Sequence, residues 1–208
     1  MQLDPSTLNE KEQYKLMTGA IVPRPIALVT TLGPLGPNAA PFSLFNMAGS
    51  APPMVMFSVG NQGDGREKDT IQNLRHLPEF VVHICNEAIA ERMNVCATDY
   101  PTGVNELVKA GLTALPSSKV KPPRIAESPV HMECKVMQII DAGERHHVVL
   151  GEVVLFHFHD GIVNEQLRVD IVKLNPIGRL SGPNYARLRE FFKLQRQFVG
   201  EVPKQLVD

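Results

Sequence analysis

A run of small and polar residues interrupts the first third of the chain, where an apolar strand would be expected. Residues 36–58 read GPNAAPFSLFNMAGSAPPMVMFS, and Asn38, Ser43 and Asn46 break the apolar alternation of a half-buried strand. The two alanines would let a flat ring approach the main chain, where unpaired N–H and C=O groups could read the edge of a heterocycle. Pro41 has no N–H group and would keep the segment out of a central ladder. The segment favours a small-molecule site, although a proline-interrupted strand whose polar residues cap turns has the same composition.

A second candidate site is the sequence EKDT at residues 67–70. Lys68 offers a point charge and Thr70 a hydroxyl group, and a helix predicted over residues 68–77 would add the N–H donors of its first turn. We expect Asp69 to be the N-cap of this helix, because a carboxylate that faced an anion would repel it. These groups could hold a phosphate, and a plain capped surface helix is the alternative.

Histidines near the C-terminal third raise the question of a metal site. The sequence HFHD places His157 and His159 on one face of a strand, because side chains alternate along a strand, and Asp160 follows directly. Two histidines are too few to close a site, and no third ligand stands at a supporting spacing. We therefore predict no metal.

The composition is that of an ordinary globular protein. The 208 residues, 43% hydrophobic and 21% charged, suit a single domain over 1–208. A net charge of -1 without any Lys/Arg block argues against a nucleic-acid partner. The cysteines, Cys85, Cys96 and Cys134, show neither zinc spacing nor a disulfide framework, which favours free thiols in a reducing compartment. Residues 1–17 lack the apolar core of a signal peptide and no apolar run is long enough for a membrane helix, so we expect a cytoplasmic protein without membrane contact.

Strands are the elements that must position these residues. Short strands are predicted over residues 25–31, 54–60 and 79–85, and long strands over 130–142 and 146–160, the last two joined as a hairpin. Antiparallel hairpins without a regular alternation of strand and helix predict a mainly-β barrel that carries helices, and not a doubly wound sheet.

Helical spacing is found in four segments, residues 68–77, 86–98, 105–115 and 184–198. The third is expected to end at Gly111. The fourth is predicted as an amphipathic C-terminal helix whose apolar residues are Leu188, Phe191, Phe192 and Leu194.

The order and separation of five segments extend this interpretation. They are VPRPIALVTTLGPLGPNAAPFSLFNMAGSAPPMVMFSVG, KDTIQNLR, EFVVHI, HHVVLGEV and NPIGRLSGPNY. Together they resemble the flavin reductase-like family of FMN-binding split barrels, over residues 17–185. The resemblance implies a Greek-key antiparallel barrel followed by the C-terminal helix, with FMN rather than FAD as the cofactor.

The resemblance also implies which residues hold the flavin. The isoalloxazine ring and the ribityl chain would face Thr30, Thr31 and the backbone of Asn38, Ala39, Ala40, Pro41 and Phe42, with Ser43 and Asn46 continuing that wall. Backbone donors near N1, O2 and N5 would stabilise the negative charge of a reduced ring. The phosphate end would meet Lys68 and Thr70, with Arg24 as a further contact, and Arg179 would cover the flavin or pack across a dimer seam.

A nicotinamide cofactor is the reductant that the resemblance implies. NAD(P)H would transfer hydride to flavin N5, and the electrons would pass to an acceptor or a partner oxygenase, so no acid–base pair is needed. The sequence contains no GxGxxG fingerprint, so we do not predict a separate nicotinamide-binding domain. His146 is the candidate contact for the nicotinamide or for the face of the flavin ring. An electron carrier without efficient NAD(P)H turnover is the alternative. We also expect a homodimer, with the flavin sites near its seam.

Overall fold

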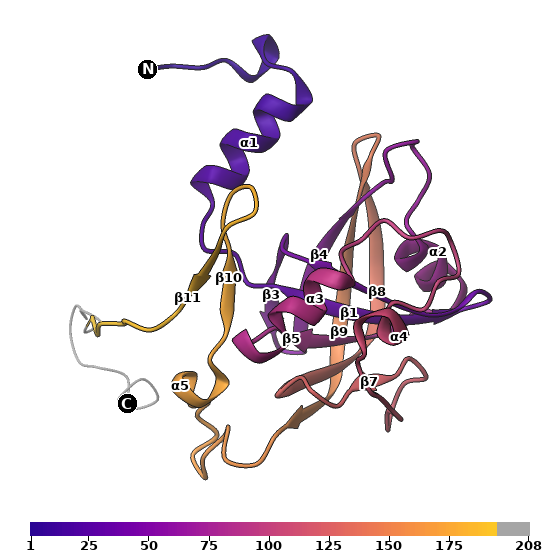
Figure 1. Ribbon diagram of the computed structural model, residues 1–208, viewed down its shortest axis with the longest axis vertical. Helices are drawn as coiled ribbons and strands as arrows, with labels where there is room; N and C mark the ends of the chain where they lie inside the picture. Colours follow the sequence, from indigo (N-terminus) through magenta and orange to yellow (C-terminus); the bar gives the residue numbers. More distant parts are fainter. Residues whose placement is uncertain (195–208) are drawn as a thin grey trace.

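Seven antiparallel strands form the body of the protein (Figure 1). The structure is a computed structural model, and it describes residues 1–194. The strands lie in the order β2-β1-β5-β8-β9-β4-β3, so that β2 and β3 are the two edges of the sheet. Their bounds are β1 Ala27–Gly33, β2 Gly36–Phe42, β3 Phe45–Ser50, β4 Pro53–Gly60, β5 Glu79–Ile84, β8 Val130–Ala142 and β9 His146–Phe158.

Aromatic contacts show that the sheet curls into a barrel. The ring of Phe42, on the edge strand β2, lies 5.1 Å from that of Phe57 on β4, a strand near the opposite edge. Phe57 also meets Phe80 of β5 edge-on at 5.4 Å. These buried rings and the β-branched residues around them fill the interior. The mainly-β barrel predicted from the sequence is confirmed.

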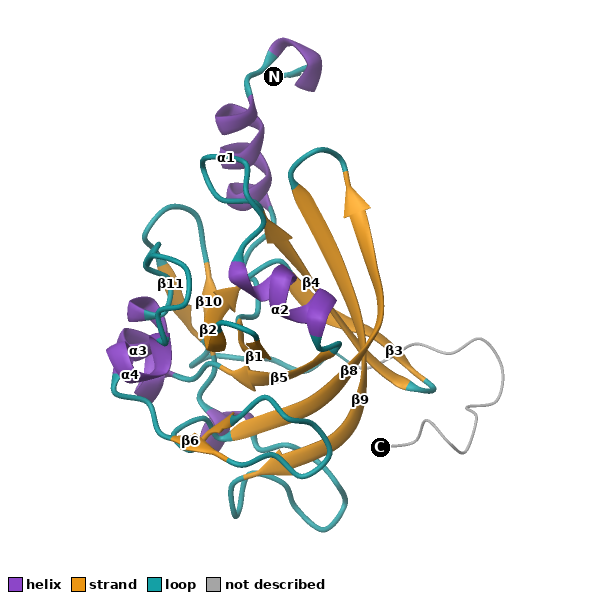
Figure 2. Ribbon diagram, turned by 90° about the vertical axis from the view of Figure 1, so that its right-hand side faces the viewer, coloured by secondary structure: helices purple, strands orange, loops and turns teal. Residues whose placement is uncertain are grey.

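Helices pack against the barrel at two places (Figure 2). Helix α2, Asp69–His76, packs Ile71 and Leu74 into the barrel interior. The short helices η2 (Glu87–Ile89), α3 (Ala90–Val95) and α4 (Glu106–Ala110) build a second apolar cluster against Leu28 and Ala39. As predicted, α4 ends at Gly111, whose φ of 63° is left-handed.

An N-terminal arm and a small hairpin lie beside the barrel (Figure 1). The arm holds η1 (Pro5–Thr7) and α1 (Glu10–Ala20), which begins with a capping box between Asn9 and Glu12. The other small elements are β6 Ala114–Leu115, β7 Arg124–Ile125, α5 Ile171–Leu174, β10 Ile177–Arg179 and β11 Tyr185–Arg187. Among residues 1–194, no helix is long and apolar enough to cross a membrane.

The C-terminal helix predicted over residues 184–198 is wrong in its described part. Tyr185–Arg187 forms β11, which pairs with β10, and residues 188–194 are not helical; residues 195–198 lie outside the described part of the chain. Helices in proteins are stabilised mainly by packing of an apolar face. Phe191 and Phe192 are 63% and 82% exposed, so nothing within residues 1–194 supplies that packing.

Candidate functional site

The small-residue segment forms an edge strand whose outer side is almost free of donors. Strand β2 pairs with β1 through the register Thr31↔Asn38, Val29↔Ala40 and Ala27↔Phe42. In an antiparallel pair, N–H and C=O of one residue point the same way and alternate residues face opposite edges. The N–H of Ala39 donates to Glu106 Oε2 at 3.0 Å, outside the sheet, so positions 37, 39 and 41 face outward. Positions 37 and 41 are prolines.

The expectation of free main-chain donors beside Asn38–Phe42 is therefore wrong. Asn38, Ala40 and Phe42 face β1, Pro37 and Pro41 have no N–H, and the N–H of Ala39 is taken by Glu106. The segment does pair in a ladder, but only on one side, because prolines are tolerated at the outward positions of an edge strand. What this edge presents to its surroundings is carbonyl oxygen.

A buried hydrogen-bond network fixes this edge. Asn38 donates from Nδ2 to Glu106 Oε1 at 2.8 Å, and its Oδ1 accepts from Thr70 at 2.9 Å. Asn73 donates from Nδ2 to Thr31 Oγ1 at 3.1 Å. The network ties β1, β2, α2 and α4 together. Three of the predicted flavin contacts therefore use their side chains in hydrogen bonds within the protein, namely Asn38, Thr31 and Thr70.

A hollow opens beside the outer edge of β2. It encloses about 590 Å³ when the space open to solvent is included. The lining brings together six predicted site residues, Asn38, Ala40, Pro41, Phe42, Lys68 and Thr70, and adds Gln62, Asp69, Cys96, Ala97, Thr98, Asp99, Tyr100 and Glu106. One wall is small and apolar, and another carries Lys68 together with the carboxylates of Asp69 and Asp99.

Lys68 and Asp69 occupy the start of α2 differently from the prediction. Lys68, not Asp69, is the N-cap residue, and its Nζ lies 3.6 Å from the exposed Asp99. Asp69 is the first helical residue, and its carboxylate accepts from Thr102 at 3.2 Å and from the N–H of Gly103 at 3.1 Å. The Asp69 carboxylate thus anchors the loop at Thr102 and Gly103. The ammonium group of Lys68 faces the exposed Asp99, a partner that an anion can displace.

Other predicted contacts lie away from the hollow. Thr30 is buried and donates to Pro123 O at 2.6 Å. The Arg24 guanidinium is buried and donates to carbonyl groups of α1 and of Leu180, so it anchors the N-terminal arm. Arg179 stacks 4.5 Å from the centre of the Tyr185 ring. Asn46 is exposed on β3 and caps the N–H of Met47, and Ser43 is half-buried in the turn after β2.

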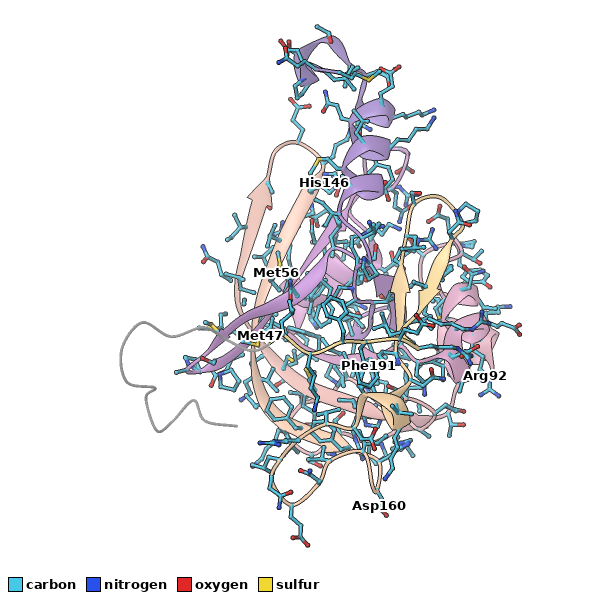
Figure 3. The ribbon with its side chains drawn as sticks, turned by 90° about the vertical axis from the view of Figure 1, so that its left-hand side faces the viewer. Met47, Met56, Arg92, His146, Asp160 and Phe191 are labelled. Carbon is cyan, nitrogen blue, oxygen red and sulfur yellow. The ribbon has the colours of Figure 1, made fainter. Side chains whose placement is uncertain are left out.

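The two consecutive histidines have different environments. His146 is half-buried at the start of β9, opposite Gly60 and Ala142, at the end of the long hairpin that approaches α1 (Figure 3). His147 is buried and bonds Asp141 at 2.8 Å and Asn61 at 3.0 Å. His147 therefore holds the hairpin to the loop after β4, while His146 is the more accessible of the two.

Histidines of β5, β8 and β9 lie near one another, and one of them contacts a buried carboxylate. His157 Nε2 lies 2.6 Å from Glu133, which also accepts from the N–H groups of Ser118, Lys119 and Val120. The rings of His83 and His131 lie 5.2 Å apart and are tilted by 57° to each other. Within residues 1–194, no three His, Cys, Asp or Glu side chains are arranged to hold a metal ion.

Glu106 is the residue of this site that the sequence analysis missed. It follows Asn105, the N-cap of α4, and an acidic residue in a first helical turn is ordinary. Cys96 is a free, buried thiol, as predicted, and it also lines the hollow. Burial, followed by the charge of Glu106, raises the pKa of the Cys96 thiol to about 12, so Cys96 is no nucleophile at neutral pH.

Comparison with known proteins shows the family to which the chain belongs. The flavin reductase like domain matches residues 18–171. Protein BH2278 of Halalkalibacterium halodurans is 39% identical over 207 residues, covering 97% of this chain and 99% of its own.

Two solved structures share both fold and sequence. Nitrilotriacetate monooxygenase component B from Bacillus cereus superimposes with a TM-score of 0.89 at 36% identity, covering 93% of this chain and 98% of its own. The 2-nitrobenzoate 2-nitroreductase NbaA of Pseudomonas fluorescens superimposes with a TM-score of 0.86 at 37% identity, covering 100% and 99%. The split-barrel fold predicted from the sequence is confirmed.

Proposed function

The chain belongs to the flavin reductase-like family, and from this premise we propose that it binds FMN in the hollow beside β2 and accepts hydride from NAD(P)H. The observation that carries the proposal is the pairing of a flat, small-residue wall at Ala40 and Pro41 with the cationic N-cap of α2 at Lys68. The wall suits a ring and the helix start suits a phosphate.

The residues present fit such a cofactor. When bound, the flavin supplies the two-electron chemistry. The buried network around Asn38 fixes the ring-facing strand to α2 and α4, so that the wall and Lys68 keep one geometry. Phe42, packed on Phe57, lines the hollow and would exclude water from one side of a bound ring. NAD(P)H would approach from the open side as a transient substrate.

Anaerobic mixing tests this function. The purified protein should take up one FMN per chain and should bleach at the long-wavelength flavin band when NADH or NADPH is added. A flavin that stays yellow with both nicotinamides would identify an electron carrier, the second candidate. A protein that takes up no FMN would contradict both.

The acceptor is proposed from the two similar structures. One is a monooxygenase component and the other a nitroreductase. We infer that the reduced flavin serves a partner oxygenase, and a nitroaromatic acid is the other acceptor to test. Steady-state NADH oxidation with free FMN and with 2-nitrobenzoate separates them, because only a nitroreductase consumes the nitro compound stoichiometrically.

Lys68→Ala should weaken FMN binding by about 1.5–3 kcal/mol, or roughly 10- to 150-fold in Kd, because a charge-assisted contact to phosphate is lost. Lys121→Ala, which removes an equal charge from an exposed loop position, is the matched control. Fluorescence titration measures both, and riboflavin, which has no phosphate, should not distinguish Lys68→Ala from the wild type. Equal FMN affinity in the two variants would place the phosphate elsewhere.

We also propose that the protein is a homodimer. Exposed apolar side chains lie on β3, β8 and β9 and on the C-terminal segment, among them Met47, Met137, Ile140, Phe156 and Phe191. Figure 3 shows where Met47 and Phe191 lie. A second copy of this chain would cover such side chains where they adjoin one another. Light scattering at micromolar concentration should give twice the 23.0 kDa chain mass, and a monomer mass would refute the dimer.

A further inference from the structure

One side chain covers the only N–H group on the outer edge of β2 between positions 37 and 41. Two of its three outward positions are prolines, and the third, Ala39, has its N–H covered by Glu106. Without that carboxylate, the edge would present one N–H between outward carbonyl groups. Glu106 therefore decides whether the outer edge of β2 offers a hydrogen-bond donor.

Glu106 is held for this task by both of its oxygens. Oε2 accepts from Ala39 N–H at 3.0 Å and Oε1 accepts from Asn38 Nδ2 at 2.8 Å. The side chain comes from the first turn of α4, where Asn105 caps the N–H of Leu107, and it is buried while still lining the hollow. Both partners are donors, so a carboxylate satisfies them and a carboxamide, with a single acceptor oxygen, cannot.

The electrostatic setting makes this carboxylate sensitive to a neighbour. Burial and the nearby Asp69 raise the pKa of Glu106, and the bonds from Ala39 and Asn38 oppose that rise. A buried negative charge acts strongly over short distances, because little water screens it. A ring that docks in the hollow would feel it.

We propose that Glu106 is a positioning residue that selects the orientation of the flavin ring and tunes its potential. By covering the outward N–H of β2, it leaves carbonyl oxygens facing the hollow, and these match the single N–H of the oxidised isoalloxazine ring rather than its acceptor edge. Its charge disfavours negative charge on the reduced ring and so lowers the reduction potential. This inference rests on the proposed flavin function.

Glu106→Gln is the direct test, with Glu127→Gln as the matched control. Glu127 also accepts a backbone N–H, that of Thr113 at 3.0 Å, but lies outside the lining of the hollow. Glu106→Gln should bind FMN about tenfold more weakly and should shift the midpoint potential of the bound flavin to a more positive value. Glu127→Gln should change neither. Glu106→Asp keeps the charge, so its flavin should have a midpoint potential closer to that of the wild type. If Glu106→Gln does not fold, Glu106→Asp still tests the role of the charge.

The possible results separate this inference from the function on which it rests. A wild type that binds FMN, with Glu106→Gln at the wild-type potential and affinity, would overturn the positioning role and leave the flavin function standing. Equal potential shifts in Glu106→Gln and Glu106→Asp would overturn the charge effect. A wild type that binds no FMN would overturn both proposals.

Discussion

Glu133→Ala should lower the free energy of unfolding by about 3–5 kcal/mol, because the backbone N–H groups and the histidine that now bond to the buried Glu133 carboxylate would lose their partner. The Glu133 side chain is fully buried and lies 2.6 Å from His157 Nε2. It also accepts three backbone N–H bonds from the loop Ser118–Val120, at 2.8, 2.5 and 3.2 Å. Burial raises the pKa of this carboxyl, but the N–H bonds and His157 outweigh burial and lower it. The carboxylate thus fastens the loop to the barrel.

Urea denaturation measures this effect. Glu133→Gln keeps the shape but offers one acceptor oxygen, so it should cost less than the alanine variant. Glu165→Ala, at an exposed loop position, should stay within about 0.5 kcal/mol of the wild type. A loss below about 1 kcal/mol in Glu133→Ala would mean that the loop finds other partners at little cost.

Acid should destabilise the protein well before its carboxylates titrate. Burial, followed by the charges of His131 and Arg124, lowers the pKa of His83 to about 3. His83 Nδ1 lies 2.8 Å from Leu28 O and its Nε2 accepts from the N–H of Ile125 at 3.0 Å, so a proton on Nε2 would face another proton. Burial also lowers the pKa of His131 to about 4.

The sign follows from where each state takes up protons. Below a pH of about 6.5, the pKa of an unfolded histidine, His83 and His131 are protonated in the unfolded chain and neutral in the folded protein. The unfolded state then binds two more protons, so the free energy of unfolding falls as pH falls. The slope should approach about 2.7 kcal/mol per pH unit near pH 5, since each proton contributes about 1.4. The loss should level off only below the folded pKa values near 4 and 3.

Urea midpoints between pH 7 and pH 5 measure the slope above the range in which carboxylates titrate. His131→Gln removes one of the two rings and should roughly halve the slope, whereas His76→Gln, at an exposed position of α2, should leave it unchanged. A wild-type stability that does not change over this range would contradict the neutral, buried state of both rings.

Much of the barrel could be predicted from the sequence, because its strands carry their own signals. The long runs at 130–142 and 146–160 and the helix at 68–77 correspond to β8, β9 and α2 within a few residues. The C-terminal segment has an equally clear helical pattern, yet β11 forms there. Periodicity reports an apolar face, but it does not say whether the chain provides a surface to bury it.

The site was harder to predict for a related reason. Pro37 and Pro41 do mark an edge strand, but only the register with β1 shows that both fall on its outward side. Asp69 and Glu106 both look like ordinary acids at helix starts, and only the fold shows that one anchors a loop and the other covers Ala39. Which partner a polar side chain finds depends on elements that are distant in the sequence.

The most direct test of the flavin site is a crystal structure of the protein grown with FMN. We expect density for the ring in the hollow against the outer edge of β2, with its N–H toward a β2 carbonyl oxygen and its phosphate within salt-bridge distance of Lys68. Flavin bound on another face, or a hollow that stays empty at saturating FMN, would contradict the site proposed for this protein.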